Sequence, residues 1–587
     1  MKIIADQIVR TIEVVLMRLK KSKVNILVFF FYFLSTIFFL KPLVFNAKTR
    51  LPDLGDSIHN IWIMGFNARK ILQLKFNFFE TNIFYPEKAA GTFAEANIAQ
   101  SIIFIPFYLL DQFVFGYNFQ IFLSFLLSAY FVYLIAFFFS KNVLSSCLAG
   151  FIFGFFPYRY AHLPHLQQIS TQWFLLAFYL YIKYLDSPSF LSGTLSALSF
   201  LFQVVSWGYN TIYLYILVFL YFLWIIVNSS RKKRARLFKQ NFYLFSPILI
   251  IVIPFYLPYL KSYLNGYFRA MAGLESYGND LLLYFSSSPI SKAYGKFSLR
   301  FQGIRPDWVI SGVFPGFLVY ILLFLSIFTI KKFRQKISFL LDYSNKEKLF
   351  FVLFLILSFF LSLGPSIKIA GIKLIPNLVS RLSEFLIFGK SIRYVPNYII
   401  LFMFSLSVII SLGIPCFLKR IKSRALSILF ALFVIVILAL EFHCKINTVN
   451  FSYSGSKISR SYQELSRIKD EFAIFEIPFI SRIALQDPYF LMQFKYMYFS
   501  IYHGKKLVNG ISGFFPDFFS QLVILYGKGK MGKLVTELKK SGVKYILFHK
   551  ESFKTRREAE KFFSAVMKTG HVEVNRDFGN DVLLNIK

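Results

Sequence analysis

Long apolar stretches recur along the chain, and short loops rich in Lys and Arg separate them. An α-helix needs about 20 largely apolar residues to cross a bilayer. A hydrophobic content of 56% exceeds the roughly 45–50% that fills the core of a soluble domain. The sequence therefore predicts a polytopic α-helical membrane protein. Its apolar stretches lie at roughly 24–45, 97–115, 117–140, 143–157, 171–186, 189–206, 209–228, 242–263, 309–330, 349–363, 396–417 and 425–442.

The basic loops give the orientation of these stretches. Strongly basic loops occur at 231–236, 331–336 and 419–424, and the N-terminus is also basic. Loops of this kind lie on the cytoplasmic side of a membrane. A formal net charge of +37 is also typical of nucleic-acid-binding proteins. Because these charges lie in short loops beside apolar stretches, we expect the lipid bilayer as a partner and no nucleic acid.

One apolar stretch must not cross the membrane if all four basic segments lie on the same side. The best candidate is 97–115, which contains Gln100, Pro106 and Asp111. We expect it to form a juxtamembrane helix on the outer surface. About 11 transmembrane helices then remain, with outer loops at 46–116, 264–308 and 364–395.

Three regions follow from this topology. Residues 1–23 have apolar side chains at helical spacing, which favours a cytoplasmic amphipathic segment; an ordinary cytoplasmic tail is the alternative. Residues 24–442 form the transmembrane domain. Residues 443–587 combine charged helical patterns with β-like runs at 472–477, 544–548 and 582–586. We expect this last region to be a small α/β domain on the periplasmic side.

The first outer loop contains the most informative polar pattern. Asp53, Asp56, His59 and Asn60 are spaced so that they would share one face of a helix. A carboxylate at the membrane rim can act as a general base toward an acceptor hydroxyl. The alternative is a helix N-cap, a position that Asp favours.

Glu95 stands at the start of the predicted juxtamembrane helix. An acid at this position is a second candidate for catalysis. The alternative is electrostatic, because the N-terminus of a helix favours a negative charge.

The chain resembles the GT-C superfamily of membrane glycosyltransferases, which includes protein mannosyltransferases and the lipid A aminoarabinose transferase. An acidic first outer loop, a juxtamembrane helix, many crossings and a C-terminal domain carry the resemblance. The chain is also similar, over nearly its whole length, to uncharacterised bacterial membrane proteins of that superfamily. The matching segments are Gly55-Asp56, Asn82-Ile-Phe-Tyr-Pro86, Pro157-Tyr-Arg159, His165-Leu-Gln167, Ser170-Thr-Gln-Trp173, Gly364-Pro365, Arg393-Tyr-Val-Pro396 and Val508-Asn509-Gly510.

The resemblance implies a GT-C-like fold in the bacterial inner membrane. It also implies a sugar donor carried on polyprenyl phosphate and an acceptor in the cell envelope. Asp56 would correspond to the catalytic acid of the first loop, with Asp53 as the fallback. Glu95 resembles the second acid, although Ala96 and Asn97 follow it where the aminoarabinose transferases have Lys and Pro.

A polyprenyl-phosphate donor needs cations beside its phosphate, and Arg supplies bidentate contacts. The candidates are Arg393, Arg159 and Arg305. The alternative for each is that it extends its charged end to the membrane surface.

Other polar residues of the outer segments are candidates for acceptor contacts. His59 and His165 belong to the membrane-side loops, whereas Tyr502, His503 and Asn509 lie in the C-terminal region, in segments that could form a lid or an ordinary loop. His162 and His165 also suggest a divalent metal, but their motif contains no third ligand. No cofactor is therefore assigned, and a divalent metal is the alternative.

Several absences restrict the function. The sequence contains no Walker loop and no Gly-rich dinucleotide fingerprint, which favours a membrane-borne donor over a nucleotide sugar. The Trp-Trp-Asp signature of related oligosaccharyltransferases is missing at Trp207-Gly208. The leading hypothesis is a glycosyltransferase. A transporter or flippase for a lipid-linked saccharide and a non-catalytic envelope assembly factor are the alternatives; the first would favour paired repeats and acids within the crossings.

Overall fold

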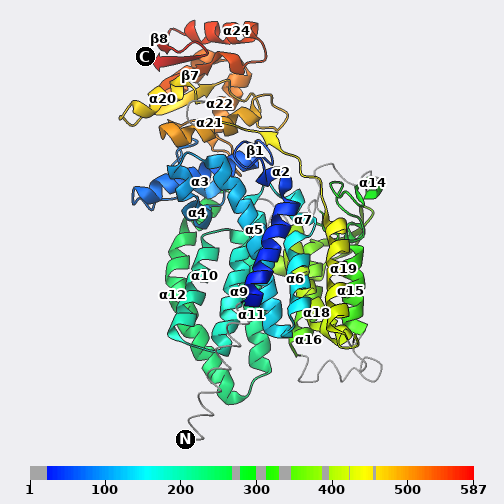
Figure 1. Cartoon of the computed structure of the whole chain (residues 1–587). Coiled ribbons are helices and arrows are strands. Elements are labelled where there is room, and N and C mark those ends of the chain that lie inside the picture. The colour runs from blue at the N-terminus through cyan, green and yellow to red at the C-terminus, as the bar shows by residue number, and fades with distance from the viewer. Residues whose placement is uncertain are drawn as a thin grey trace, which may run out of the picture.

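A computed structural model describes residues 23–267, 278–298, 312–328, 346–385, 395–421, 423–453 and 458–587. Its helices run side by side in one bundle, with a smaller α/β part at one end (Figure 1). Within the described residues, five helices are long and apolar enough to cross a membrane. They are α5 (Phe113–Ser140), α11 (Gly208–Val227), α12 (Arg231–Leu264), the η7–α18 segment (Val395–Leu418) and α19 (Arg424–Phe442).

Shorter apolar helices complete the bundle. They are Lys23–Phe39, α6 (Val143–Phe155), α9 (Gln172–Asp186), α10 (Phe190–Val204), α15 (Phe317–Phe328) and α16 (Lys346–Ser362). The chain is therefore mostly helical, as predicted, whereas the number of crossings stays a prediction. The expected basic loop at 231–236 is instead the first turns of α12, because Lys and Arg are good helix formers. Residues 1–22 and the basic segment 331–336 lie outside the described residues.

Two helices lie at the end of the bundle nearest the α/β part (Figure 1): α3 (Asp56–Leu72) and α4 (Ile98–Leu109). With 12 residues, α4 is about 18 Å long, shorter than the roughly 30 Å hydrocarbon core. Asn97, before α4, bonds to Asn60 of α3, and Asn118 of α5 bonds to the carbonyl of Arg50. Both ends of the 97–115 segment thus lie close to residues 50–60, in the first part of the outer loop. This geometry is compatible with a non-crossing helix, and its place in a membrane stays a prediction.

The C-terminal part contains a five-stranded mixed sheet with strand order β6-β5-β7-β9-β8. The strands β5 (Ala473–Ile477), β6 (Lys506–Leu507) and β7 (Val543–His549) are parallel, and β9 (Asp581–Ile586) pairs antiparallel with β7 and with β8 (Val572–Asp577). The three β-like runs of the sequence correspond to β5, β7 and β9. Each is largely buried, which explains their apolar composition.

Several contacts fasten this sheet to the first outer loop. Strand β1 (Arg50–Leu51) pairs with β4 (Val449–Asn450). Helix α21 (Phe490–His503) lies along α3, with Ile501 against Gly65. The backbone N–H of Leu507 donates to the carbonyl of Asn82. The C-terminal part is therefore packed directly on the helix that begins at Asp56.

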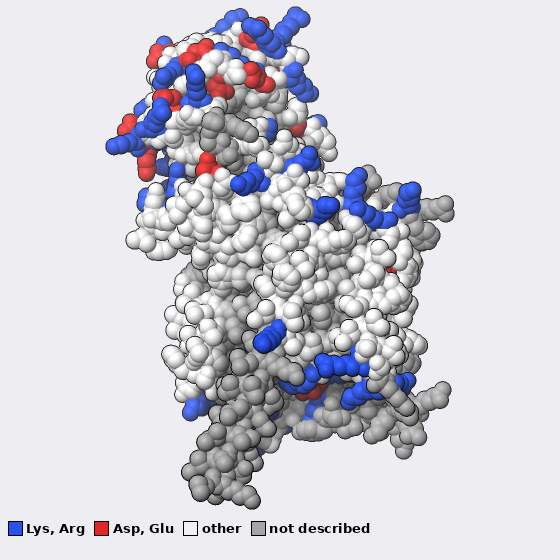
Figure 2. All heavy atoms as spheres, in the orientation of Figure 1, with Lys and Arg blue, Asp and Glu red and all other residues white. Residues whose placement is uncertain are grey.

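Charged side chains are unevenly distributed (Figure 2). The middle of the bundle is almost free of them in this view, whereas Lys and Arg gather at its lower end and over the C-terminal part. Large apolar side chains on α12, such as Ile250 (74% exposed), face outward. This arrangement is typical of a bundle whose middle faces lipid.

Candidate active site

The first turn of α3 is built around Asp53. Its carboxylate accepts hydrogen bonds from the backbone N–H groups of Asp56 (3.2 Å) and Ser57 (2.9 Å). The helix begins at Asp56, so Asp53 lies before it. The prediction that Asp53 shares one helix face with Asp56, His59 and Asn60 is wrong for Asp53. Its carboxylate instead binds N–H groups that have no partner within the helix.

Asp56 is the exposed carboxylate of the site, with 52% of its side chain accessible. Its Oδ2 lies 3.2 Å from Nε2 of His165. Burial lowers the pKa of His165, but the hydrogen bond and the charge of Asp56 outweigh it and raise this pKa above its usual value. The pair therefore joins a carboxylate to an imidazole that is readily protonated.

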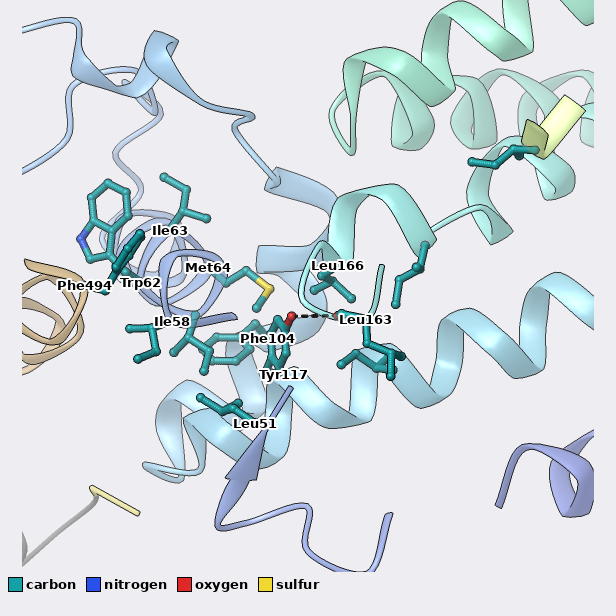
Figure 3. Packing of buried hydrophobic residues seen from close by; sticks show 14 of the residues in the cluster. Leu51, Ile58, Trp62, Ile63, Met64, Phe104, Tyr117, Leu163, Leu166 and Phe494 are labelled. Carbon is teal, nitrogen blue, oxygen red and sulfur yellow. Dashed lines mark hydrogen bonds between the residues drawn. The ribbon is translucent and has the colours of Figure 1, made fainter. Parts of the chain in front are cut away.

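Apolar side chains of α3 pack into a buried cluster that holds the helix in place. Trp62, Ile63 and Met64 of α3 lie beside Tyr117 and Phe494 in one apolar cluster (Figure 3). The hydroxyl of Tyr117 donates to the carbonyls of Leu163 and Pro164, just before His165. The loop that carries His165 is thereby fastened to this apolar cluster.

His59 lies one turn after Asp56, between aromatic rings. Its ring centroid lies 5.5 Å from that of Trp62 and 6.5 Å from that of Phe494. Burial lowers the pKa of His59 despite the charge of Asp56. A neutral His59 is thus expected, in contrast to His165.

Glu95 lies against the start of a different helix from the one predicted. Its Oε2 accepts the backbone N–H of Gly208 at 3.2 Å, and Gly208 is the first residue of α11. The electrostatic interpretation of Glu95 therefore applies to α11 rather than to α4. Burial raises the pKa of Glu95 to about 7, and the N–H groups of Gly208 and Trp207 offset only part of this effect.

Buried amides join Glu95 to the start of α3. Asn60 donates to the carbonyls of Asp56 (2.8 Å) and Pro164 (3.3 Å), and its Oδ1 accepts from Asn97 at 2.9 Å. Asn67 donates to the carbonyl of Ala96 at 2.6 Å. These hydrogen bonds hold the segments that carry Asp56 and Glu95 next to each other.

The segment before His165 leads to the head of α18. The rings of His162 and Tyr158 are stacked with centroids 4.1 Å apart, and those of His162 and His165 are 5.8 Å apart. The hydroxyl of Tyr158 donates to Asn397, which lies in η7 (Val395–Tyr398). The rings of His165, His162 and Tyr158 thus connect Asp56 with η7. In the sequence, η7 follows shortly after Arg393.

Arg159 is buried rather than displayed at the surface. Its guanidinium donates to Thr171, Ser124 and the carbonyl of Ile169, and it lies 4.4 Å from the ring centroid of Phe125. No carboxylate forms an ion pair with it among the described residues. Arg159 thus places a positive charge among neutral groups. The other two candidates, Arg305 and Arg393, lie outside the described residues.

Of the three C-terminal candidates, His503 and Asn509 are buried and Tyr502 is partly buried. The hydroxyl of Tyr502 donates to Asp111 at 2.7 Å. His503 is buried, and burial together with nearby cations lowers its pKa to about 3. Asn509 bonds to both backbone groups of Glu476 and to Gln493. The bond of Tyr502 fastens α21 to the segment before α5, whereas the bonds of Asn509 fasten the loop after β6 to β5 and to α21.

No metal site is formed by the described side chains. No group of three or more His, Cys, Asp or Glu residues gathers in the described ranges in a way that could hold an ion. Asp56 and His165 together supply one carboxylate and one imidazole, whereas a catalytic zinc site has three protein ligands.

Several residues that shape the site carry no signal in the sequence. Asn97, Trp207 and Gly208 are distant from Asp56 along the chain and belong to no motif that predicts their contact. Asn60 is the exception, because its spacing after Asp56 placed it on the same face of the predicted helix. The remaining contacts depend on how α3, α4 and α11 meet.

Comparisons with known proteins give a distant likeness to solved structures. The chain matches no protein family profile and no curated protein. Among solved structures, it is similar to the oligosaccharyltransferase of Archaeoglobus fulgidus in its apo form, with 12% identity, a TM-score of 0.43, and coverage of 90% of this chain and 70% of that one. It is also similar to the archaeal oligosaccharyltransferase AglB of the same organism in complex with an inhibitory peptide and a dolichol-phosphate, with 12% identity, a TM-score of 0.43, and coverage of 97% and 75%. Likeness at this level assigns no activity to the chain.

Proposed function

We propose that the protein is a membrane glycosyltransferase that moves a sugar from a polyprenyl-phosphate donor to a cell-envelope acceptor. The observation that carries this proposal is the Asp56–His165 pair. It places an exposed carboxylate, held at 3.2 Å from an imidazole, at the end of an apolar helix bundle. A lipid-borne donor would present its reacting carbon near that level, because its chain stays in the bilayer.

In the proposed reaction, Asp56 accepts the proton of an acceptor hydroxyl. The hydroxyl oxygen attacks the anomeric carbon, the bond from that carbon to the phosphate oxygen breaks, and the polyprenyl phosphate leaves with inversion. His165 orients Asp56 and stabilises its charge. Glu95 is the proposed second acid, and its pKa of about 7 suits a group that exchanges a proton near neutral pH.

The leaving phosphate needs positive charge, for which Arg393, Arg305 and Arg159 are proposed. Arg159 has neutral hydrogen-bond partners, so no carboxylate of the described residues is paired with its charge. We propose that it acts through the field of this charge, whereas Arg393 and Arg305 would contact the phosphate. His59, Tyr502, His503 and Asn509 are assigned to support of the site or to the acceptor side.

The test uses the full chain in lipid nanodiscs with a panel of polyprenyl-phosphate sugars and candidate acceptors. We expect the wild type to release polyprenyl phosphate and Asp56→Asn to lose at least 100-fold in rate, a loss within the usual range for a general base. Asp517→Asn is a matched control, because Asp517 is also the first residue of a helix, α22 (Asp517–Gly527). Equal activity of Asp56→Asn and wild type would exclude Asp56 as the general base. Binding of donors without turnover, unchanged in Asp56→Asn, would favour a transporter.

A further inference from the structure

One helical face of the C-terminal part has a strong excess of positive charge. It consists of α23 (Met531–Lys540), α24 (Arg556–Met567) and the residues that flank them; we call it the α23–α24 face. Residues 528–568 contain 12 Lys or Arg residues and 4 Asp or Glu residues. The basic residues are Lys528, Lys530, Lys533, Lys539, Lys540, Lys544, Lys550, Lys554, Arg556, Arg557, Lys561 and Lys568.

Few of these cations are neutralised within the protein. Lys540 pairs with Glu537 (2.8 Å), Arg556 with Glu560 (3.1 Å) and Lys550 with Asp577 (3.0 Å). The other nine form no ion pair with any described residue. Of the remaining acids, Glu558 already accepts the hydroxyl of Tyr489 at 2.9 Å.

By contrast, acidic residues of α20 (Arg460–Arg467) and β8 form ion pairs with nearby cations. Glu464 pairs there with both Arg467 (2.7 Å) and Arg576 (3.0 Å), and Glu573 pairs with Lys587 (3.3 Å). The excess of unpaired cations is thus concentrated on the α23–α24 face rather than spread evenly over the domain.

The cations point outward because the other sides of both helices are buried. Helix α23 buries Met531, Leu534, Val535 and Leu538, and α24 buries Ala559 and Val566. Residues four apart on a helix are neighbours, and the like charges of Arg557 and Lys561 at this spacing destabilise α24. Repulsion between these cations therefore lowers the stability of the helix, and a bound anionic partner would reduce this repulsion.

We propose that the α23–α24 face binds an anionic polymer with repeated phosphate or carboxylate groups. In the proposed function this polymer would be the acceptor, which the face would hold near the site; that part rests on the proposed function. The spread of the cations over two helices fits a chain of charges better than a single phosphate ion.

The position of the face argues for a polymer over lipid headgroups. Helix α24 lies at the end of the molecule farthest from the helix bundle (Figure 1), and Lys and Arg are prominent there (Figure 2). Charges beyond a Debye length of about 8 Å are largely screened at physiological salt. The bilayer around the bundle is therefore a poor partner for this face.

The test measures binding of linear polyphosphate to the full chain in zwitterionic nanodiscs. The variant combines Lys530→Gln, Lys533→Gln and Lys561→Gln, three exposed positions. The control combines Lys445→Gln, Lys469→Gln and Arg482→Gln, which are also exposed and remove the same charge from elsewhere in the C-terminal part. We expect the variant to bind at least tenfold more weakly at 50 mM salt, with a shallower dependence on salt. The control should stay within twofold of wild type.

Three results would overturn the proposal. Equal losses in both triple variants would show an effect of net charge alone. Polyphosphate binding no tighter than that of inorganic phosphate would exclude a polymer site. Vesicles of anionic phospholipid that bind wild type more tightly than polyphosphate does, and lose that binding in the variant, would assign the face to a membrane. Because no sugar donor is used, none of these results bears on glycosyl transfer itself.

Discussion

Glu95 illustrates how two local effects compete at one side chain. The N–H of Gly208 at the start of α11 favours the charged carboxylate. Burial disfavours it more strongly, and the pKa rises to about 7. A carboxyl group that would normally be ionised at neutral pH therefore changes charge within the physiological range.

The first prediction concerns the pH dependence of activity. Glu95 loses its proton between about pH 6 and pH 8. If its carboxylate takes part in transfer, the rate should rise over this range and level off above it. Glu95→Gln should abolish this limb and lower the rate at pH 8 about 100-fold. Rates measured from pH 5.5 to pH 9 check this, and an unchanged limb in the variant would assign it to another group.

A second residue-scale feature is a buried charge network in the C-terminal sheet. His549 lies between Glu476 (2.8 Å) and Asp581 (2.7 Å), which come from neighbouring strands. Burial lowers the pKa of His549, but its two bonds outweigh burial and raise the pKa to about 9. The same pairing holds the pKa of Asp581 at about 2 against the effect of burial.

The second prediction is that this network makes stability depend on alkaline pH. Because the pKa of His549 is raised by folding, its contribution is full below about pH 6.5 and is lost as pH rises through 9. The shift corresponds to about 3 kcal/mol at most. We expect His549→Gln to lower the Tm at pH 6 and to flatten the decline between pH 6.5 and 9. Thermal unfolding in nanodiscs measures both, with the exposed His571→Gln as the control.

At the scale of elements, the contact of α21 with α3 is the main structural link between the sheet and the site. An added Cβ at Gly65 would meet Ile501 at 3.0 Å. At Gly504, with φ of +66°, it would overlap the guanidinium of Arg69, which donates to the carbonyl of Tyr502. The two helices therefore approach closely only because both positions lack a side chain.

The third prediction is that Gly65→Val separates α21 from α3. Overpacking at such a contact costs about 1–3 kcal/mol, and the displaced helix would change the position of Asp56. We expect a lower Tm and a slower transfer rate. Gly532→Ala is the control, because an added Cβ meets nothing within 4 Å there; in α23 it should stabilise by about 1 kcal/mol. A Gly65→Val variant with normal Tm and normal rate would show that the contact is not needed.

At the scale of the whole molecule, topology depends on whether the 97–115 segment crosses the membrane. Both of its ends lie beside the first outer loop, so α5 should start on the outer side. We therefore expect Lys48 and Lys141 on opposite sides of the membrane, with Arg482 on the same side as Lys48.

The fourth prediction tests this topology by cysteine labelling. Single cysteines replace Lys48, Lys141 or Arg482 in a background without Cys147, Cys416 and Cys444. An impermeant thiol reagent applied to intact spheroplasts should label positions 48 and 482 but not 141. Labelling at both 48 and 141 would place both ends of α5 outside and contradict the topology.

The sequence alone determined the helical membrane class, the approximate positions of the long helices and three strands of the C-terminal sheet. These follow from apolar length, loop charge and alternation, which are local properties of the chain. It also singled out Asp56, Glu95 and His165 as candidates. It did not place Asp53 before the helix or show that Glu95 lies at the start of α11.

Only the tertiary structure decided which polar groups meet. Asp56 and His165 are 109 residues apart along the chain and lie 3.2 Å apart, and Glu95 meets Gly208 across 113 residues. No local periodicity encodes such contacts, because they depend on how several helices pack at one end of the bundle. The tertiary structure also decided the protonation of these side chains, because the pKa of a carboxyl or imidazole group depends on burial and on partners that folding supplies.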